Sequence, residues 1–249
     1  MTNAVLGVLL LGSAIGLCPP MLALTAESTC PPELVEATRL ILVVASNMNA
    51  RTATVRLMER PSREKKWNEV GEVTKAMLGS AGIGWAWAFE NFARQEDPIK
   101  HEGDGRTPAG FFHVGRPFGF GPGPAKDYIR LEKGKTFCVN DVRSPYYNMI
   151  MSKSQAGDGT TGEDMGTIAL YRRGLFIEYP TTRERKGGSC IFIHIWRSPE
   201  SATSGCVALA EDDVVNLQKW SERRPTLVGI VPQAALKRLQ SCFPRSGGT

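Results

Sequence analysis

Three short apolar runs limit this chain to a β-rich fold: LILVVA at 40–45, GLFIEY at 174–179 and CIFIHIW at 190–196. Each has the length of an ordinary strand and is enriched in β-branched and aromatic residues. Residues 53–60 alternate apolar and polar side chains, as a half-exposed strand does. The 26 glycines and 16 prolines supply the turns that such a fold needs. We therefore predict a β-rich fold with only short helices.

The remaining segments extend this prediction along one domain. Further strands are expected at 67–78 and 226–231, and a polar hairpin loop at 183–188. The Gly- and Pro-rich stretch from about 79 to 124 predicts frequent turns. Helices are expected at 31–38, 211–220 and 234–239, the second because acidic residues open it and apolar residues then recur at helical spacing. No linker divides the chain, so we predict a single catalytic domain over 27–249.

The first thirty residues predict export. Residues 4–17 are almost wholly apolar, two prolines follow, and Ala23 and Ala26 offer a small-residue cleavage site. This layout is typical of a secretory signal peptide, here over residues 1–26. No Lys or Arg precedes the apolar run, so an uncleaved membrane anchor is the alternative, although the prolines interrupt the ~20 apolar residues that a span needs. We expect an exported protein of the periplasm or cell envelope.

Export changes the interpretation of the cysteines. Five of them follow the apolar segment: Cys30, Cys138, Cys190, Cys206 and Cys242. In an oxidising compartment four of them can form two disulfides, which leaves one free. Four cysteines allow three pairings, and the spacing does not choose among them. The useful question is therefore which thiol is the odd one.

Composition excludes several classes of function. A net charge of +5 suits an anionic partner such as a cell-wall polymer, but it also describes an ordinary solvated surface. No basic run interleaved with aromatic residues indicates nucleic-acid binding. His101 and His113 lie far apart and have no carboxylate or thiol at ligand spacing, so no metal site is expected. We predict no cofactor, no nucleic-acid partner and a monomer.

The run at 190–196 places a histidine on a rigid element. Side chains of a strand alternate between its faces, so the isoleucines at 191, 193 and 195 bury one face. Cys190, Phe192, His194 and Trp196 point to the other face. His194 is then either a core histidine bonded to the backbone or a base held between large rings.

A cysteine follows twelve residues after this histidine, in the sequence Thr203-Ser204-Gly205-Cys206. Gly205 allows the tight backbone turn that would expose the Cys206 side chain. A neighbouring imidazole can deprotonate such a thiol, and the N–H groups of Gly205 and Cys206 can stabilise an oxyanion. The alternative is a structural thiol or half of a disulfide. Together with His194, the pattern favours a catalytic nucleophile.

Three stretches of the chain carry a family resemblance. The histidine strand followed by TSGCV at 203–207 resembles the active-site signature of the L,D-transpeptidase catalytic domain family (YkuD type). EGDGRTPAGF at 102–111 is similar to the family's GDGxTPxG segment. SPYYN at 144–148 and CIFIHIWR at 190–197 resemble a subgroup of short, exported bacterial members. The resemblance covers roughly residues 40–232.

The resemblance implies packed, curved mixed sheets with Cys206 and His194 at the mouth of a groove. It implies acyl transfer on peptidoglycan stem peptides: Cys206 attacks the carbonyl at a diaminopimelate–D-Ala bond, and His194 acts as the general base. The loop formed by Thr203, Ser204 and Gly205 would shape the oxyanion site. A second stem's amine, or water, would then resolve the thioester.

The chain also departs from the family's pattern. Many members have a second histidine where this chain has Ser204, and an arginine where it has Ala208. Arg197 is the nearby candidate for binding a substrate carboxylate. Trp196 and Tyr147 are further candidates for the groove wall, although packing is an equal alternative for Tyr147.

Three hypotheses remain open at this point. The first is an L,D-transpeptidase, and the second is an L,D-carboxypeptidase or endopeptidase that uses the same thioester. The third is a non-catalytic cell-wall binding module stapled by disulfides, in which Cys206 itself is bridged. If Cys206 is the odd thiol, we favour Cys30 with Cys242, which ties the chain ends, and Cys138 with Cys190, which braces the histidine strand.

Overall fold

The computed structural model describes residues 1, 30–123, 126–222 and 225–243. The predicted signal peptide at 1–26 therefore lies almost wholly outside the described residues. The strands are β1 Arg39–Ala45, β2 Thr52–Glu59, β3 Asn68–Met77, β4 Ile83–Trp85, β5 Thr107–Gly119, β6 Ile129–Arg130, β7 Thr136–Val139, β8 Ile150–Ser152, β9 Gly162–Asp164, β10 Arg173–Glu178, β11 Phe192–Ile195, β12 Val207–Leu209 and β13 Leu227–Pro232.

The helices are short, as predicted. The α-helices are α1 Pro32–Glu36, α2 Lys153–Ala156, α3 Glu211–Ser221 and α4 Gln233–Arg238. The 3-10 turns are η1 Trp87–Phe92, η2 Met165–Thr167, η3 Ala169–Arg172 and η4 Gln240–Cys242. None of these described helices is long and apolar enough to cross a membrane.

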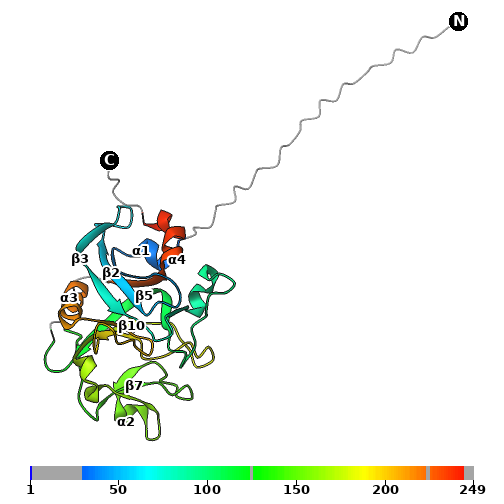
Figure 1. Ribbon diagram of the computed structural model, residues 1–249. Coiled ribbons are helices and arrows are strands. Elements are labelled where there is room, and N and C mark those ends of the chain that lie inside the picture. Colours follow the sequence, from blue (N-terminus) through cyan, green and yellow to red (C-terminus); the bar gives the residue numbers. More distant parts are fainter. Residues whose placement is uncertain (2–29, 124–125, 223–224, 244–249) are drawn as a thin grey trace.

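The large sheet is mixed and closes on itself (Figure 1). Its strand order is β10-β11-β12-β3-β2-β1-β13-β5-β4, and β10 also pairs with β5. The pairs β1–β13 and β11–β12 are parallel, whereas β1–β2, β2–β3, β10–β11 and β5–β13 are antiparallel. Curvature and mixed pairing agree with the predicted architecture.

The apolar runs form strands β1, β10 and β11 of this sheet. In β1 all residues after Arg39 are buried, and every residue of β13 is buried. Strands covered on both faces read as continuous apolar runs, which is why the sequence reveals them. The isoleucines at 191, 193 and 195 join this main core, while Phe192 packs on the opposite side with Phe118 and Tyr171. The predicted alternation is confirmed.

The stretch from 79 to 124 contains more regular structure than predicted. Its glycines and prolines do not prevent the long strand β5, which spans Thr107–Gly119. Two of these glycines mark close approaches: a Cβ at Gly110 would lie 2.4 Å from the Phe89 ring, and one at Gly119 would lie 2.3 Å from the Arg172 carbonyl oxygen. Glycine inside a strand is expected where another group comes this near.

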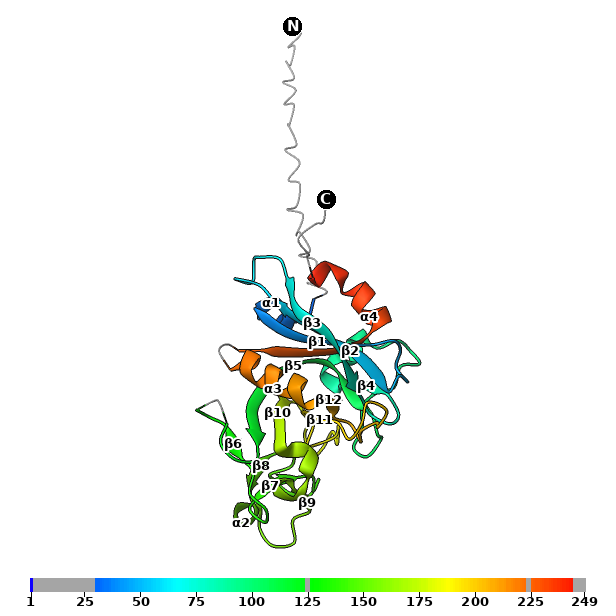
Figure 2. The same cartoon turned by 60° about the vertical axis from the view of Figure 1, so that its left-hand side comes forward.

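A small second sheet, in the order β8-β7-β9, forms a separate lobe with α2 (Figure 2). This lobe was not predicted, because its strands are only three or four residues long. A disulfide between Cys138 of β7 and Cys190 joins the lobe to the segment before β11. An apolar cluster that includes Leu131, Met165 and Phe192 fills the space between lobe and large sheet.

The histidine strand is shorter than the predicted 190–196, since β11 begins at Phe192. Cys190 lies before the strand in a left-handed conformation, with a φ of 55°. The Asn148 side chain accepts the Cys190 N–H at 2.9 Å, and the disulfide holds its side chain. These long-range contacts hold Cys190 outside the strand, and the local sequence pattern does not reveal them.

Candidate active site

Two neighbouring parallel strands, β11 and β12, position His194 and Cys206. Their register pairs Ile193 with Val207 and His194 with Ala208. Residues paired in this way point to the same face of a sheet, and side chains two apart share a face. Cys206, two residues before Ala208, therefore lies on the same face as His194. Both residues line one cavity.

The Cys206 thiol is buried, with 8% of the residue exposed. Its Sγ accepts the Phe192 N–H at 3.4 Å and donates to the Cys190 carbonyl oxygen at 3.5 Å. Burial, together with the negative charge of Glu163, raises the pKa of the thiol to about 12, although the Phe192 N–H and Lys100 oppose the shift. At neutral pH the sulfur therefore carries its proton.

His194 is held as a neutral imidazole. Its Nδ1 lies 2.8 Å from the carbonyl oxygen of Ile195. Because a carbonyl only accepts, this bond places the proton on Nδ1 and leaves the Nε2 lone pair available. Burial lowers the pKa of the imidazole to about 4. The arrangement suits a general base that is ready to accept a proton near neutral pH.

The loop before Cys206 is fixed by threonine hydroxyls. Thr203 Oγ1 accepts the Gly205 N–H at 3.1 Å and donates to the Cys206 carbonyl oxygen at 2.8 Å. Thr107 Oγ1 bonds the same carbonyl at 3.2 Å. The Gly205 N–H, expected as an oxyanion donor, is therefore already engaged in the turn. Of the two amides considered, that of Cys206 is the remaining candidate.

Gly205 is required by its surroundings as well as by its backbone. Its φ is 155°, and a Cβ there would lie 3.1 Å from the Arg106 carbonyl oxygen. Arg106 belongs to the GDGRTPAG segment, so this segment and the cysteine loop pack directly against each other. Any larger residue at position 205 would push the two apart.

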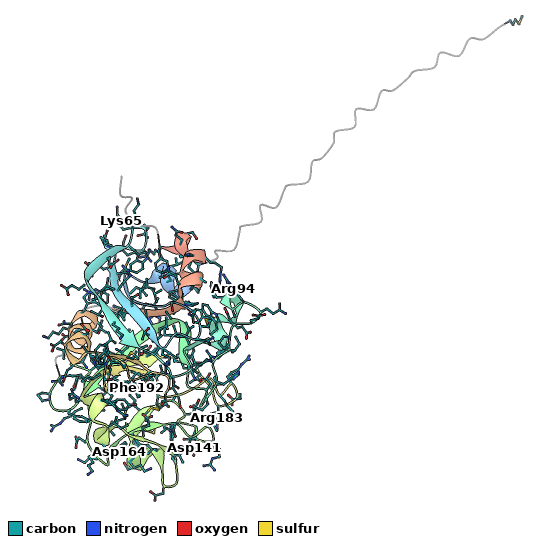
Figure 3. The ribbon with its side chains drawn as sticks, viewed as in Figure 1. Lys65, Arg94, Asp141, Asp164, Arg183 and Phe192 are labelled. Atoms are coloured by element: carbon teal, nitrogen blue, oxygen red, sulfur yellow. A yellow bond between two sulfur atoms is a disulfide. The ribbon has the colours of Figure 1, made fainter. Side chains whose placement is uncertain are left out.

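The cavity beside Cys206 has a volume of about 440 Å³. The predicted site residues Trp196, Arg197 and 203–206 all contribute to its wall, and Arg197 is exposed at that wall. In Figure 3 the Phe192 label marks the level of the site, between the large sheet and the lobe that carries Asp141 and Asp164. A cavity of this size accommodates a short peptide segment.

Tyr147 does not line the cavity. It is 7% exposed, and its hydroxyl donates to Glu102 Oε2, which also accepts from the Ser189 hydroxyl at 2.8 Å. Glu102 itself contributes to the cavity wall. Tyr147 therefore supports a wall residue, which agrees with packing, one of the two alternatives left open for this side chain.

Asp104 of the same segment shapes a turn. It accepts the backbone N–H groups of His101 at 2.7 Å and Arg106 at 2.9 Å, and it pairs with the buried Lys100 at 2.7 Å. His113 lies in β5 beside Leu227, away from the cavity. Among the described residues no group of three or more His, Cys, Asp or Glu side chains could hold a metal ion.

Two cavity residues, Glu163 and Tyr171, were not among the residues predicted from the sequence. The Tyr171 ring contacts the His194 ring edge to face, with centroids 5.3 Å apart, and its hydroxyl donates to Glu163 Oε2 at 2.8 Å. Both line the cavity. They come from the small lobe and the turn after it, so no spacing relative to His194 or Cys206 could have indicated them.

The described cysteines separate into two disulfides and one free thiol. The bridges join Cys30 with Cys242 and Cys138 with Cys190, the two pairs favoured from the sequence. Cys206 is free. A non-catalytic module with a bridged Cys206 is therefore not what the described residues form.

Fold and site together define a β-rich protein with a free thiol and a neutral imidazole in one cavity wall. The sequence model of the L,D-transpeptidase catalytic domain family, YkuD, matches residues 55–230, which include both His194 and Cys206. The chain belongs to this family. The resemblance noted from its motifs is thereby confirmed.

Two solved structures are similar to the chain. They are the helical cell shape determining protein Pgp2 from Campylobacter jejuni and a single-residue mutant of it, each at 16% identity. The TM-scores are 0.40 for the former and 0.41 for the mutant, with 78% and 79% of this chain covered. The chain spans about half the length of these structures, 47% in each case. The comparison with curated protein sequences found no match.

Proposed function

We propose that this protein is a cysteine acyltransferase that acts on peptidoglycan stem peptides, as an L,D-transpeptidase. The single observation that carries the proposal is the placement of the free thiol of Cys206 and the neutral imidazole of His194 on one sheet face, in the wall of one cavity. Membership of the L,D-transpeptidase family supports the choice of a peptide bond in the cell wall as the bond attacked.

Acylation begins from the neutral pair. As the Cys206 Sγ attacks the carbonyl carbon of the donor peptide, His194 Nε2 takes the thiol proton. The imidazolium then returns this proton to the departing amine, so that D-Ala leaves as the carbon–nitrogen bond breaks. The donor remains as a thioester on Cys206. General-base transfer during the attack avoids a free thiolate, which burial disfavours.

Deacylation regenerates the thiol. The amine of a second stem attacks the thioester carbonyl, the carbon–sulfur bond breaks, and the amine proton passes through His194 to the sulfur. The products are a new amide bond and the free Cys206 thiol. Water attacking in the same way would give a carboxylic acid and release a tripeptide stem, which is the carboxypeptidase outcome. The same base and the same cavity serve both acceptors.

Other groups have supporting roles in this proposal. The Cys206 N–H is the proposed oxyanion donor, and a donor of this kind contributes about 3–4 kcal/mol to transition-state stabilisation. Arg197, exposed at the cavity wall, offers a guanidinium for a substrate carboxylate. Half-buried Trp196 supplies an apolar surface beside it.

We propose that the protein works outside the cytoplasm, in the periplasm or cell envelope. Two disulfides form and persist in oxidising compartments, and peptidoglycan is found there. The apolar segment at 1–26 is the proposed export signal.

The test is incubation of the purified mature protein with tetrapeptide muropeptides, with Cys206→Ser as the control. Chromatography with mass detection should show dimeric crosslinked product and free D-Ala from the wild type, and neither from the control. Tripeptide and D-Ala without dimers would identify the activity as that of a carboxypeptidase and not of a transferase. Absence of all three products from the wild type would refute the proposed function.

A further inference from the structure

The small lobe contributes one ionisable side chain, that of Glu163, to the cavity that holds Cys206. Glu163 lies in β9 directly opposite Cys138 of β7, so both side chains point to the same face of the small sheet. Cys138 is bridged to Cys190, whose carbonyl oxygen contacts the Cys206 thiol. The disulfide therefore fixes the position of the Glu163 carboxylate relative to the nucleophile.

Only one oxygen of this carboxylate is engaged. Oε2 accepts the Tyr171 hydroxyl at 2.8 Å, whereas Oε1 has no donor among the described residues. No Lys, Arg or His of the described chain forms an ion pair with Glu163. Two other charged side chains of the cavity wall have partners, since Lys100 pairs with Asp104 and Glu102 accepts two hydroxyls. The fourth, Arg197, is exposed and pairs with neither glutamate.

A half-buried carboxylate without a cation is destabilised. Burial raises the pKa of Glu163, and the neighbouring charge of Glu102 adds to the shift, although the hydrogen bond from Tyr171 opposes it. A cation that entered the cavity would recover the lost solvation through a charge-assisted hydrogen bond to Oε1. Glu163 and Cys206 line the same cavity, so Oε1 is available where a substrate must bind for Cys206 to attack it.

We infer that Glu163 is the specificity-determining residue of this cavity and that it binds a primary ammonium group of the substrate. The inference rests on the proposed function, which supplies such a group from two sources: the side-chain amine of the donor's diamino acid, and the amine of the acceptor. An ammonium carries three donors, so it bonds Oε1 and still reaches neighbouring oxygens. A metal ion would need further ligands, and the described residues offer no such group.

The experiment compares the wild type with Glu163→Gln on two tetrapeptide donors, one with a free side-chain amine and one in which that amine is acetylated. Gln keeps the shape of the side chain and an oxygen for the Tyr171 hydroxyl, but it removes the charge. D-Ala release reports acylation, and the ratio of dimer to tripeptide reports the acceptor.

If the donor supplies the ammonium, acetylation should lower kcat/KM of the wild type roughly tenfold or more and leave that of Glu163→Gln unchanged. If the acceptor supplies it, acylation should be equal in both proteins, and the dimer-to-tripeptide ratio should fall roughly tenfold in the variant. Equal sensitivity to acetylation together with an equal product ratio would overturn the inference.

Tyr171→Phe serves as the matched control, because it removes the hydrogen bond between the two side chains and leaves the negative charge of Glu163 in place. It should keep the dependence on the amine whatever its overall rate. Loss of that dependence in Tyr171→Phe but not in Glu163→Gln would assign the effect to the tyrosine and overturn the inference.

A binding measurement separates this inference from the proposed function. Calorimetry of the two tetrapeptides on Cys206→Ser, with and without Glu163→Gln, needs no turnover. The free-amine peptide should bind about tenfold more tightly than the acetylated one only when Glu163 is present. An equal preference in both proteins would overturn the inference even if the wild type proved to be an active transferase.

Discussion

At the scale of the residue, the site consists of two groups that are both neutral in the resting protein. Burial is the first cause in each case: it raises the pKa of Cys206 and lowers that of His194. A thiolate–imidazolium pair would place two charges in a wall where each is only 6–8% exposed. Proton transfer coupled to the attack avoids this charged pair in the resting site. The carbonyl of Ile195 fixes the imidazole tautomer that can accept the proton.

The raised pKa of the thiol predicts how alkylation depends on pH. A free cysteine reaches its maximal rate above its pKa of about 8.5. Cys206, with a pKa of about 12, should instead become more reactive by roughly tenfold per pH unit from pH 7 to pH 10, without a plateau. Iodoacetamide labelling of the non-reduced protein measures this. A plateau near pH 9 would contradict a buried, protonated thiol.

The lowered pKa of His194 predicts a pH-dependent stability. Between its folded pKa of about 4 and its ordinary value of 6.5, the unfolded state binds a proton that the folded state does not. The free energy of unfolding should therefore decrease as the pH falls from 6.5 towards 4, by about 3 kcal/mol at most from this group. Urea unfolding across this range should show a steeper slope for the wild type than for His194→Gln; identical slopes would argue against a buried neutral histidine.

At the scale of the element, the sequence predicted the strands that carry the chemistry but not the lobe that completes the cavity. The strand with His194 and the loop with Cys206 are visible because alternation and a glycine turn are local signals. Glu163 and Tyr171 carry no such signal, since a disulfide and a short sheet bring them to the site from outside that motif. For Tyr147 the sequence left packing and groove lining open for a related reason: its partner, Glu102, is 45 residues away in the sequence.

The Cys138–Cys190 disulfide is expected to affect both the stability of the fold and the reactivity of Cys206. Replacing both Cys138 and Cys190 by Ser should lower the free energy of unfolding by about 2–5 kcal/mol. It should also slow acylation of Cys206, because the Cys190 carbonyl that contacts the thiol loses its anchor. Thermal unfolding and D-Ala release measure the two effects. A stable double variant with undiminished acylation would show that the bridge does not position the site.

At the scale of the whole molecule, one closed sheet holds the site, and a second disulfide joins the segment before α1 to the segment after α4. Cys30 precedes α1 and Cys242 ends η4, so their disulfide spans 212 positions of the sequence. Cys242 belongs to the main core, with 8% of the residue exposed, and the partly buried Cys30 packs against this core; neither lines the cavity. Closure of a long loop stabilises a fold chiefly by restricting the unfolded chain.

The Cys30–Cys242 disulfide is expected to stabilise the fold without affecting the reactivity of Cys206. Replacing Cys30 and Cys242 by Ser should lower the free energy of unfolding by about 2–5 kcal/mol and leave the acylation rate of Cys206 within about twofold at a temperature where the variant is folded. The comparison with the Cys138/Cys190 variant is therefore internally controlled. Equal loss of acylation in both variants would mean that the effect is global.

Rapid acid quenching followed by intact-mass measurement tests the central claim most directly. The wild type, mixed with a tetrapeptide donor, should gain the mass of the donor acyl group without D-Ala, and peptide mapping should place it on Cys206. His194→Gln should form this adduct much more slowly, and Cys206→Ser should not form it. An adduct on another residue, or D-Ala release by Cys206→Ser at the wild-type rate, would contradict Cys206 as the nucleophile.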